Sequence, residues 1–265
     1  MNQGLDPALQ AHIRSLAATA PTRVFAISQN SRKLWVKTAG IPRRRSSILL
    51  QWMLATLFGL PMLRPPRRRS GAAALAAEAA AIRNLAADGF PVPEVIGCTP
   101  EWLVLGDAGT ALESDLGRLA DVDERWRRIE AAAALLSRLH AAGLWHGGAQ
   151  IRNFSWRDGR PGLLDFEDHD LPGMTRAERQ ARDLLLFLYS LTRYEPAGGP
   201  PRLPRLATAM LSEAAPDARA ALAKFLRRTN WIIALARLIQ SRAGRDVRQA
   251  VAAEDAIAAA LRATA

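Results

Sequence analysis

The chain has 265 residues, of which 49% are hydrophobic, so it is long and apolar enough for one large domain or two lobes and is not expected to be disordered. Its formal net charge is +11, almost wholly from arginine because Lys33, Lys37 and Lys224 are the only lysines, and this charge favours an anionic partner. The single cysteine, Cys98, excludes an intramolecular disulfide, and the first residues lack the apolar core of a secretory signal. We therefore expect a reducing, cytoplasmic location.

The first hundred residues alternate between short strand patterns and one helix. Residues 23–28 and 33–37 are rich in β-branched and aromatic side chains and predict a hairpin. The alanine-rich run 71–87 has apolar residues at helical spacing and stops before an Asp-Gly pair, so it predicts a helix. Two more short strands are predicted at 94–97 and 102–105.

The second half of the chain is predominantly helical. Apolar residues at helical spacing predict helices at 122–142, 176–192, 204–213, 217–238 and 245–261. Strands, one helix, more strands and then a helical half indicate an α+β fold with two unequal lobes. We place the N-lobe, which would bind a nucleotide, at 1–106 and the helical C-lobe at 107–265, with the flexible run from Gly106 to Gly109 at the boundary.

An apolar insertion, residues 41–69, interrupts the predicted N-lobe. Arginine clusters at 43–45 and 67–69 flank the run 46–63, whose 18 residues carry no charge. Basic flanks around an apolar run suit an anionic membrane surface, and clusters at both ends favour a hairpin-like or surface-lying segment over a single crossing. We expect peripheral association with the inner membrane through residues 43–69. The alternative is an ordinary helix packed on the lobe.

Two segments of the second half carry polar residues at a characteristic spacing. The first runs from His146 to Asn153, and the second contains Asp165, Glu167 and Asp168 after a short apolar run. Phosphoryl transfer needs cations along the triphosphate and oxygen ligands that fix Mg²⁺, rather than covalent chemistry by the protein. An asparagine amide and an aspartate carboxylate supply such oxygen ligands.

With these two segments, Lys37 and Glu78, the chain resembles the protein-kinase-like superfamily, in particular its bacterial branch of aminoglycoside, lipopolysaccharide-core sugar and lipid-linked-substrate kinases. The resemblance spans about residues 24–194. It implies a bilobal protein-kinase-like fold with a small β-rich N-lobe and a larger helical C-lobe. It also implies ATP and Mg²⁺ as cofactors.

The resemblance assigns a role to each matching residue. A strand lysine of this superfamily holds the nucleotide phosphates and pairs with a helix glutamate, which implies these roles for Lys37 and Glu78. Nucleotide and metal binding are implied for Asn153 and Asp165. Structural support of the site is implied for two further residues, His146 and Asp183. Taken singly, the same side chains are also consistent with a solvated strand-end lysine, an exposed helix carboxylate and a turn aspartate.

Three departures from the superfamily pattern bear on activity. Position 148, where the loop normally carries the aspartate that accepts the substrate proton, is Gly148. Gln150 stands where a lysine or histidine is common, and the hairpin turn 29–32 has no glycine to cover the phosphates. General-base help contributes ~10²- to ~10⁴-fold, so its loss alone need not abolish turnover. Glu167 or Asp168 are candidate replacements, with Gln150 orienting a hydroxyl; alternatively both carboxylates are solvated surface groups.

Two functions follow from this pattern. The first is an ATP-dependent phosphotransferase that acts on a hydroxyl of a lipid-linked or cell-envelope saccharide at the inner face of the cytoplasmic membrane. The alternative is a nucleotide-binding pseudokinase that acts as a regulatory scaffold at the membrane. A nucleic-acid partner is not expected, because the positive charge lacks interleaved aromatic residues or a reading motif. The oligomeric state is left open.

Overall fold

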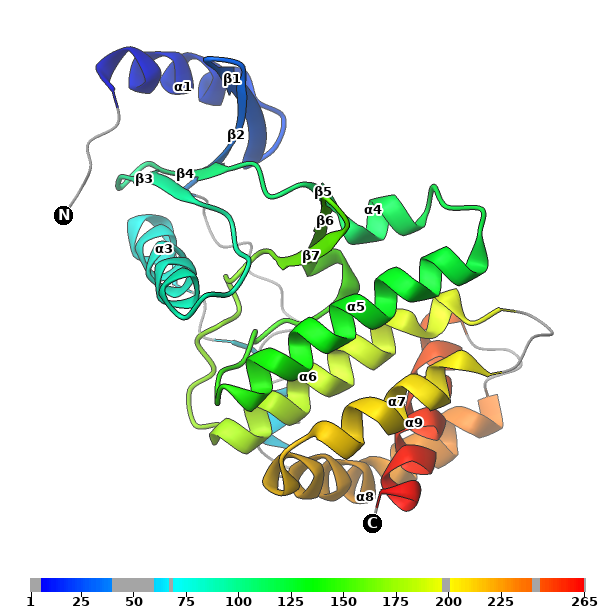
Figure 1. Cartoon of the computed structure of the whole chain (residues 1–265). Helices are drawn as coiled ribbons and strands as arrows, with labels where there is room; N and C mark the ends of the chain where they lie inside the picture. Colours follow the sequence, from blue (N-terminus) through cyan, green and yellow to red (C-terminus); the bar gives the residue numbers. More distant parts are fainter. Residues whose placement is uncertain (1–5, 40–59, 67–68, 197–200, 240–243, 265) are drawn as a thin grey trace.

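The structure is a computed structural model that describes residues 6–39, 60–66, 69–196, 201–239 and 244–264. A small lobe built on a β-sheet sits above a larger lobe of packed helices (Figure 1). The predicted α+β fold with a small β-rich lobe and a larger helical lobe is therefore confirmed. The boundary at residues 106 and 107, where β4 ends, stays a prediction.

A four-stranded antiparallel sheet forms the centre of the small lobe. Its strand order is β1-β2-β4-β3. The bounds are β1 Val24–Gln29, β2 Arg32–Thr38, β3 Val95–Cys98 and β4 Trp102–Gly106. Helix α1 (Pro7–Thr19) covers one face, with Leu9 and Ile13 buried against the sheet, and α3 (Gly71–Ala87) covers the other. The sequence analysis did not predict α1.

The alternation of side chains along β2 places Lys37 on the α3 face. Leu34 and Val36 are buried in the cluster beneath α1, so the odd-numbered residues of β2 point to the other side. Lys37 pairs in register with Leu103, which packs against Leu75 and Ala79 of α3. A lysine at this position therefore faces the helix that carries the predicted glutamate.

The β1–β2 hairpin closes more tightly than predicted. Its strands extend to Gln29 and Arg32, which leaves a two-residue turn rather than the four-residue one expected. Both turn residues, Asn30 and Ser31, have positive φ, at 49° and 62°. Positive φ at both central positions is the conformation of a type I′ turn, which matches the twist of the two strands.

The large lobe consists mainly of five long helices around one core. They are α5 (Val122–Ala141), α6 (Arg176–Leu191), α7 (Arg202–Glu213), α8 (Pro216–Ile239) and α9 (Arg245–Ala263). Smaller elements are α4 (Leu112–Leu116), β5 (Thr110–Ala111), η2 (Ile151–Asn153), β6 (Phe154–Arg157), β7 (Arg160–Leu163) and η3 (Thr192–Tyr194). The sequence analysis predicted a mainly helical half and named no strand in it, whereas β5, β6 and β7 form a second antiparallel sheet.

The end of the predicted apolar insertion packs on the large lobe. Leu60 and Met62, on either side of the start of η1 (Pro61–Leu63), are 2% exposed and belong to the core of that lobe. The Arg182 guanidinium of α6 donates a hydrogen bond to the Met62 carbonyl. Residues 40–59 of the insertion lie outside the described residues. In the part of the chain that is described, no helix combines the length and the hydropathy needed to cross a bilayer.

Candidate active site

Lys37 is the centre of a cluster of charges between the two lobes. Its Nζ lies 2.8 Å from Glu78 Oε1, 2.9 Å from Asp165 Oδ1 and 2.7 Å from Glu167 Oε1. The Lys37 side chain is 11% exposed and that of Glu78 is 3% exposed, whereas Asp165 and Glu167 are 48% and 38% exposed. The predicted pairing of Lys37 with Glu78 is therefore present, and the two more exposed carboxylates line the accessible side.

Electrostatics favour the charged forms of Lys37 and Asp165. Burial alone would lower the pKa of Lys37, but the carboxylates of Asp165, Glu78 and Glu167 raise it above its ordinary value. Burial would raise the pKa of Asp165, but the Lys37 ammonium lowers it. For Glu78, burial dominates and the pKa lies above its ordinary value despite the Lys37 contact. A cationic lysine next to an ionised aspartate suits a site for Mg²⁺ and phosphate.

The β6–β7 hairpin brings Asn153 and Asp165 together across twelve positions of sequence. Phe154 pairs with Leu163 in register, and the Leu164 amide donates to the Asn153 carbonyl at 2.8 Å. Asp165 follows with φ of 59°, in the left-handed region that aspartate tolerates better than most residues. The hairpin thus places an amide and a carboxylate at the same end of the small sheet.

Mg²⁺ commonly binds one or two protein carboxylates together with phosphate oxygens and water. The Asn153 amide nitrogen donates to the Gly148 carbonyl at 2.8 Å, which leaves the amide oxygen for a metal. The Asp165 carboxylate is half exposed. The described residues contain no cluster of three or more His, Cys, Asp or Glu arranged as metal ligands. The donor set therefore fits a Mg²⁺ ion that takes its remaining ligands from phosphate and water.

Asp183 and His146 hold the loop that runs from residue 146 to 153. Asp183 of α6 is fully buried and accepts backbone hydrogen bonds from His146 at 2.6 Å and Gly147 at 2.9 Å. The His146 ring is buried against Phe166, at a centroid distance of 4.9 Å, and its Nε2 lies 3.0 Å from the Leu164 carbonyl. Burial lowers the pKa of His146, so the ring is neutral near pH 7 and can donate to that carbonyl.

The two glycines of the loop differ in the space around them. Gly147 has φ of 92°, and a Cβ there would lie 2.4 Å from the Asp168 carbonyl oxygen, so a larger residue is excluded. At Gly148 a Cβ would meet only ordinary contacts, 3.5 Å from Asp168 Cβ, 3.7 Å from Asp168 Oδ2 and 3.6 Å from Asn153 Nδ2. The Asp168 carboxylate thus lies beside the point from which a side chain at position 148 would project.

Glu167 and Asp168 have different surroundings although they are neighbours in sequence. Glu167 Oε1 lies 2.9 Å from Arg23 Nη2 in addition to its contact with Lys37, so it faces the small lobe. Asp168, by contrast, faces Gly148 in the loop that runs from residue 146 to 153. Gln150 is half-buried in that loop, where its backbone amide donates to the Gly148 carbonyl at 2.7 Å. Their catalytic roles stay predictions.

Arg23 was missed in the sequence analysis. It precedes β1, and its guanidinium reaches Glu167, 144 positions away. A lone arginine in an arginine-rich chain gives no signal of this role. Only the register of the hairpin, in which Val24 pairs with Lys37, would have placed it next to the lysine.

The two lobes, the Lys37–Glu78 pair and the loops that carry Asn153 and Asp165 define a protein-kinase-like fold. No protein-family model matches the chain. An uncharacterized protein of Haemophilus influenzae is 28% identical over 176 residues, which are 65% of this chain and 64% of that relative. The match therefore spans less than two thirds of the relative's own length.

Three solved structures share a similar arrangement of the backbone. The Rio2 kinase of Chaetomium thermophilum in a complex with ADP/Mg²⁺ and phosphoaspartate has 15% identity and a TM-score of 0.45, over 91% of this chain and 73% of that one. A second structure of that kinase has 16% identity and a TM-score of 0.43, over 91% and 75%. The gentamicin–APH(2")-IIa complex has 13% identity and a TM-score of 0.37, over 97% and 98%.

Proposed function

We propose that this chain is an ATP- and Mg²⁺-dependent phosphotransferase in which Asp168 supplies the carboxylate that position 148 lacks. The observation that supports this most directly is the place of Asp168, whose Cβ and Oδ2 lie within 4 Å of the point where a Cβ on Gly148 would be. A carboxylate near this point can accept the proton of a substrate hydroxyl. The proposed base therefore comes from the second loop rather than from the first.

The remaining residues of the cluster supply binding and orientation. Lys37, held by Glu78, would bind phosphate oxygens, and Asn153 and Asp165 would hold Mg²⁺. Bound Mg²⁺ neutralises charge that develops on the transferred phosphoryl group. Asp183 and His146 would support the site, since Asp183 accepts the His146 amide and the His146 ring binds the Leu164 carbonyl. Most of the acceleration of phosphoryl transfer comes from such alignment and electrostatics, so a repositioned base is compatible with activity.

The proposed acceptor is a hydroxyl of a lipid-linked or cell-envelope saccharide. Only residues 169–174 separate Asp168 from Thr175, whose side chain caps α6. Within this short connection, the His169 ring stacks on Trp145 at a centroid distance of 5.1 Å. The connection therefore contains no long segment that could bind a peptide. A short connection of this kind supports a small or lipid-borne acceptor over a protein substrate.

The test is phosphate transfer from radiolabelled Mg²⁺-ATP to a bacterial membrane extract. We expect Asp168→Asn to reduce the initial rate by ~10²- to ~10⁴-fold. Asp170→Asn is the matched control, because this nearby carboxylate pairs with Arg69 and lies outside the cluster. Equal rates for the wild type and Asp168→Asn would exclude Asp168 as the base. Nucleotide binding by the wild type without any transfer would support the alternative, a pseudokinase scaffold, which Gly148 favours.

The proposed location is an anionic membrane surface, and α8 supports it. The largest exposed apolar side chains of the described residues include Trp231 at 54%, Leu235 at 55% and Leu238 at 81%, which share one face of this helix. The exposed cations Lys224 and Arg228 precede them at helical spacing. A helix with a tryptophan, aliphatic residues and basic side chains on one surface suits the interface of an anionic bilayer.

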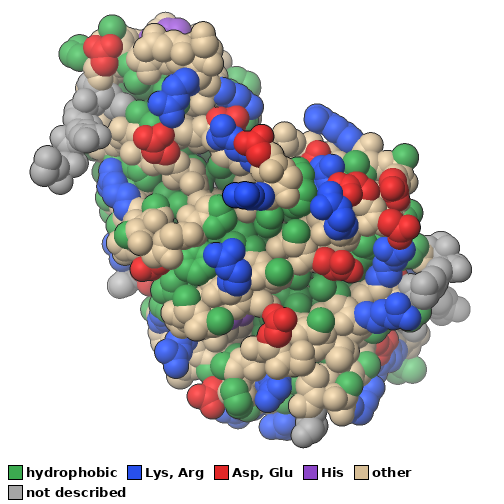
Figure 2. All heavy atoms as spheres, in the orientation of Figure 1, with side chains coloured by type: hydrophobic (Ala, Val, Ile, Leu, Met, Phe, Trp, Pro, Cys, Tyr) green, Lys and Arg blue, Asp and Glu red, His purple; other side chains and the backbone are tan. Residues whose placement is uncertain are grey.

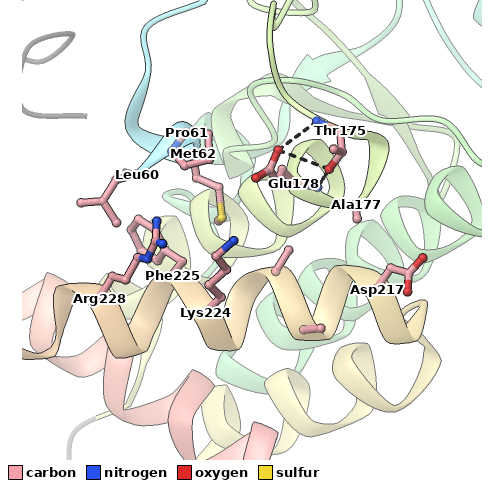
Figure 3. A pocket seen from close by; sticks show the side chains of 12 residues that line it. Leu60, Pro61, Met62, Thr175, Ala177, Glu178, Asp217, Lys224, Phe225 and Arg228 are labelled. Atoms are coloured by element: carbon pink, nitrogen blue, oxygen red, sulfur yellow. Dashed lines mark hydrogen bonds between the residues drawn. The ribbon is translucent and has the colours of Figure 1, made fainter. Parts of the chain in front are cut away.

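The described end of the apolar insertion lies next to this face. Figure 3 shows Lys224 and Arg228 projecting from α8 toward Leu60 and Met62, around a pocket of about 250 Å³. Residues 60–62 and the basic residues of α8 therefore lie on the same side of the large lobe. On the face shown in Figure 2, by contrast, basic and acidic side chains are interleaved over both lobes.

Vesicle sedimentation tests the location. With vesicles that contain phosphatidylglycerol, we expect the double variant Leu235→Ser, Leu238→Ser to bind at least about tenfold more weakly than the wild type. Val24→Ser is the matched control, because Val24 is an exposed apolar residue, 41% accessible, in the small lobe. Unchanged binding by the double variant would exclude this face. A dimeric wild type that becomes monomeric in the double variant would instead identify a second copy of the chain as the partner.

A further inference from the structure

Two cations of the small lobe converge on one carboxylate oxygen. Arg23 Nη2 lies 2.9 Å and Lys37 Nζ lies 2.7 Å from the same atom, Glu167 Oε1. An oxygen between an ammonium and a guanidinium is the arrangement in which proteins bind phosphate as well as carboxylate groups. The Glu167 carboxylate therefore marks a position where an anionic oxygen is stabilised by both cations.

The hairpin fixes the position of Arg23 relative to Lys37. The Arg23 carbonyl accepts hydrogen bonds from the Thr38 amide at 2.9 Å and from its hydroxyl at 3.2 Å. The Arg23 guanidinium in turn donates from Nε to the Thr38 carbonyl at 3.2 Å. Because Thr38 follows Lys37 directly, these three hydrogen bonds tie the guanidinium to the strand end that carries the lysine.

The carboxylates of the cluster differ in how firmly they are held. Glu78 is buried, binds Lys37 and accepts the Phe166 amide at 3.3 Å, so it is a fixed partner of the lysine. Glu167 is 38% exposed, and its partner Arg23 is 44% exposed, so solvent screens this ion pair and the pair is weak. Of the two exposed carboxylates, Glu167 is the one that contacts both Arg23 and Lys37, so an incoming anion that binds both cations would take its place.

We infer that Arg23 and Lys37 form a two-cation cradle for a phosphate oxygen of the nucleotide, and that Glu167 competes with the phosphate for this cradle. This inference rests on the proposed function for the identity of the ligand. The hairpin turn contains Asn30 and Ser31 and has no glycine, so its backbone offers no flexible loop over the phosphates. A flexible loop would bind the phosphates through its backbone amides. In this chain the Arg23 guanidinium would bind them through its charge instead.

Titration of the full chain with Mg²⁺-ATP and with adenosine tests the cradle. We expect Arg23→Gln to weaken the binding of Mg²⁺-ATP about tenfold or more and to leave adenosine binding unchanged, because adenosine has no phosphate. We expect Glu167→Gln to strengthen the binding of Mg²⁺-ATP several-fold, because it removes the competitor. Arg14→Gln is the matched control, since Arg14 pairs with Glu101 on the surface of the same lobe.

Inorganic tripolyphosphate separates failure of the cradle from failure of the proposed function. Loss of tripolyphosphate binding in Arg23→Gln, with no binding of ATP by the wild type, would keep the cradle and reject the nucleotide. Equal affinities of Arg23→Gln and the wild type for both phosphate ligands would overturn the inference. Weaker binding of Mg²⁺-ATP by Glu167→Gln would also overturn it, because Glu167 would then assist binding rather than compete. A wild type that binds neither ligand rejects the cradle as well.

Discussion

The site has a small-lobe side and a large-lobe side, on either side of the segment 165–168. The two sides differ in how they depart from the superfamily pattern described in the sequence analysis. On the small-lobe side, Lys37 and Glu78 form the expected pair, and the novelty is an added arginine, Arg23, that shares Glu167. On the large-lobe side, the loop backbone is held in place by Asp183, but the expected carboxylate at position 148 is absent and Asp168 lies beside the gap. The comparison teaches that the expected Lys37–Glu78 pair and the support of the loop by Asp183 are both present, whereas our proposals assign two charged groups of the site to other positions, Arg23 and Asp168.

Asp165 touches both sides of the cluster, so its replacement should have the largest effect. We expect Asp165→Asn to reduce phosphate transfer by about 10³-fold or more, because it removes the proposed metal ligand and a partner of Lys37. Asparagine tolerates the positive φ of this position, which separates the chemical effect from backbone strain. Asp158→Asn is the matched control, since Asp158 also has positive φ, at 50°, and lies in the β6–β7 turn. Similar rates for both variants would contradict the proposed role of Asp165.

Moving the carboxylate back to position 148 sharpens the comparison on the large-lobe side. In the Asp168→Asn background, we expect Gly148→Asp to restore phosphate transfer by about 10²-fold, because the new carboxylate would project beside the replaced one. Gly148 has room for a Cβ at ordinary contact distances, so the substitution fits the loop. Initial rates of the single and double variants measure the effect. No recovery in a folded double variant would argue against an exchangeable carboxylate.

The neighbouring glycines give a prediction on stability alone. We expect Gly147→Ala to lower the free energy of unfolding by roughly 2–4 kcal/mol, because its Cβ would collide with the Asp168 carbonyl and its φ is positive. Gly148→Ala should change it by less than about 1 kcal/mol. Urea denaturation of the two variants checks the difference. Equal losses would show that the loop adapts at both positions.

Much of the fold was predictable because it depends on local patterns. Helices α3, α5 and α6 begin at the predicted residues, and each ends within one residue of its predicted end. Helix α1 was missed because its two core residues, Leu9 and Ile13, give a weak signal. The small sheet of β5, β6 and β7 was missed because its strands are at most four residues long.

The site, like the fold, has a part that the sequence predicted and a part that it did not. The resemblance implied that Asn153 and Asp165 meet at one site, and the β6–β7 hairpin places both residues at the same end of the small sheet. The choice between Glu167 and Asp168 was not predictable, since the direction of each side chain depends on the backbone of a loop that begins with a positive φ at Asp165. The role of Arg23 depends on strand register and on a contact across the two lobes, which no local pattern encodes.

Asp183 links the loop to pH, and its replacement should have a smaller effect than Gly147→Ala. Burial would raise its pKa, but hydrogen bonds from His140 and from the His146 amide lower it below the ordinary value. A carboxyl group with a lowered folded pKa stabilises the protein above its unfolded pKa of about 3.9, and this contribution is lost as the pH falls through the folded value. We expect Asp183→Asn to lower the free energy of unfolding by roughly 1.5–3 kcal/mol at pH 7, and this difference should shrink below about pH 4.

Denaturation at pH 7, 5 and 3.5 separates this effect from a general loss of packing. Asparagine keeps the shape of the side chain but replaces one acceptor of the Asp183 carboxylate, which binds the amides of His146 and Gly147, with a donor. Asp158→Asn, at a carboxylate whose side chain is 89% exposed, should show a difference within about 0.5 kcal/mol at every pH. A loss in Asp183→Asn that stays constant from pH 7 to 3.5 would mean that the second hydrogen-bond acceptor, rather than the charge on Asp183, holds the loop against α6.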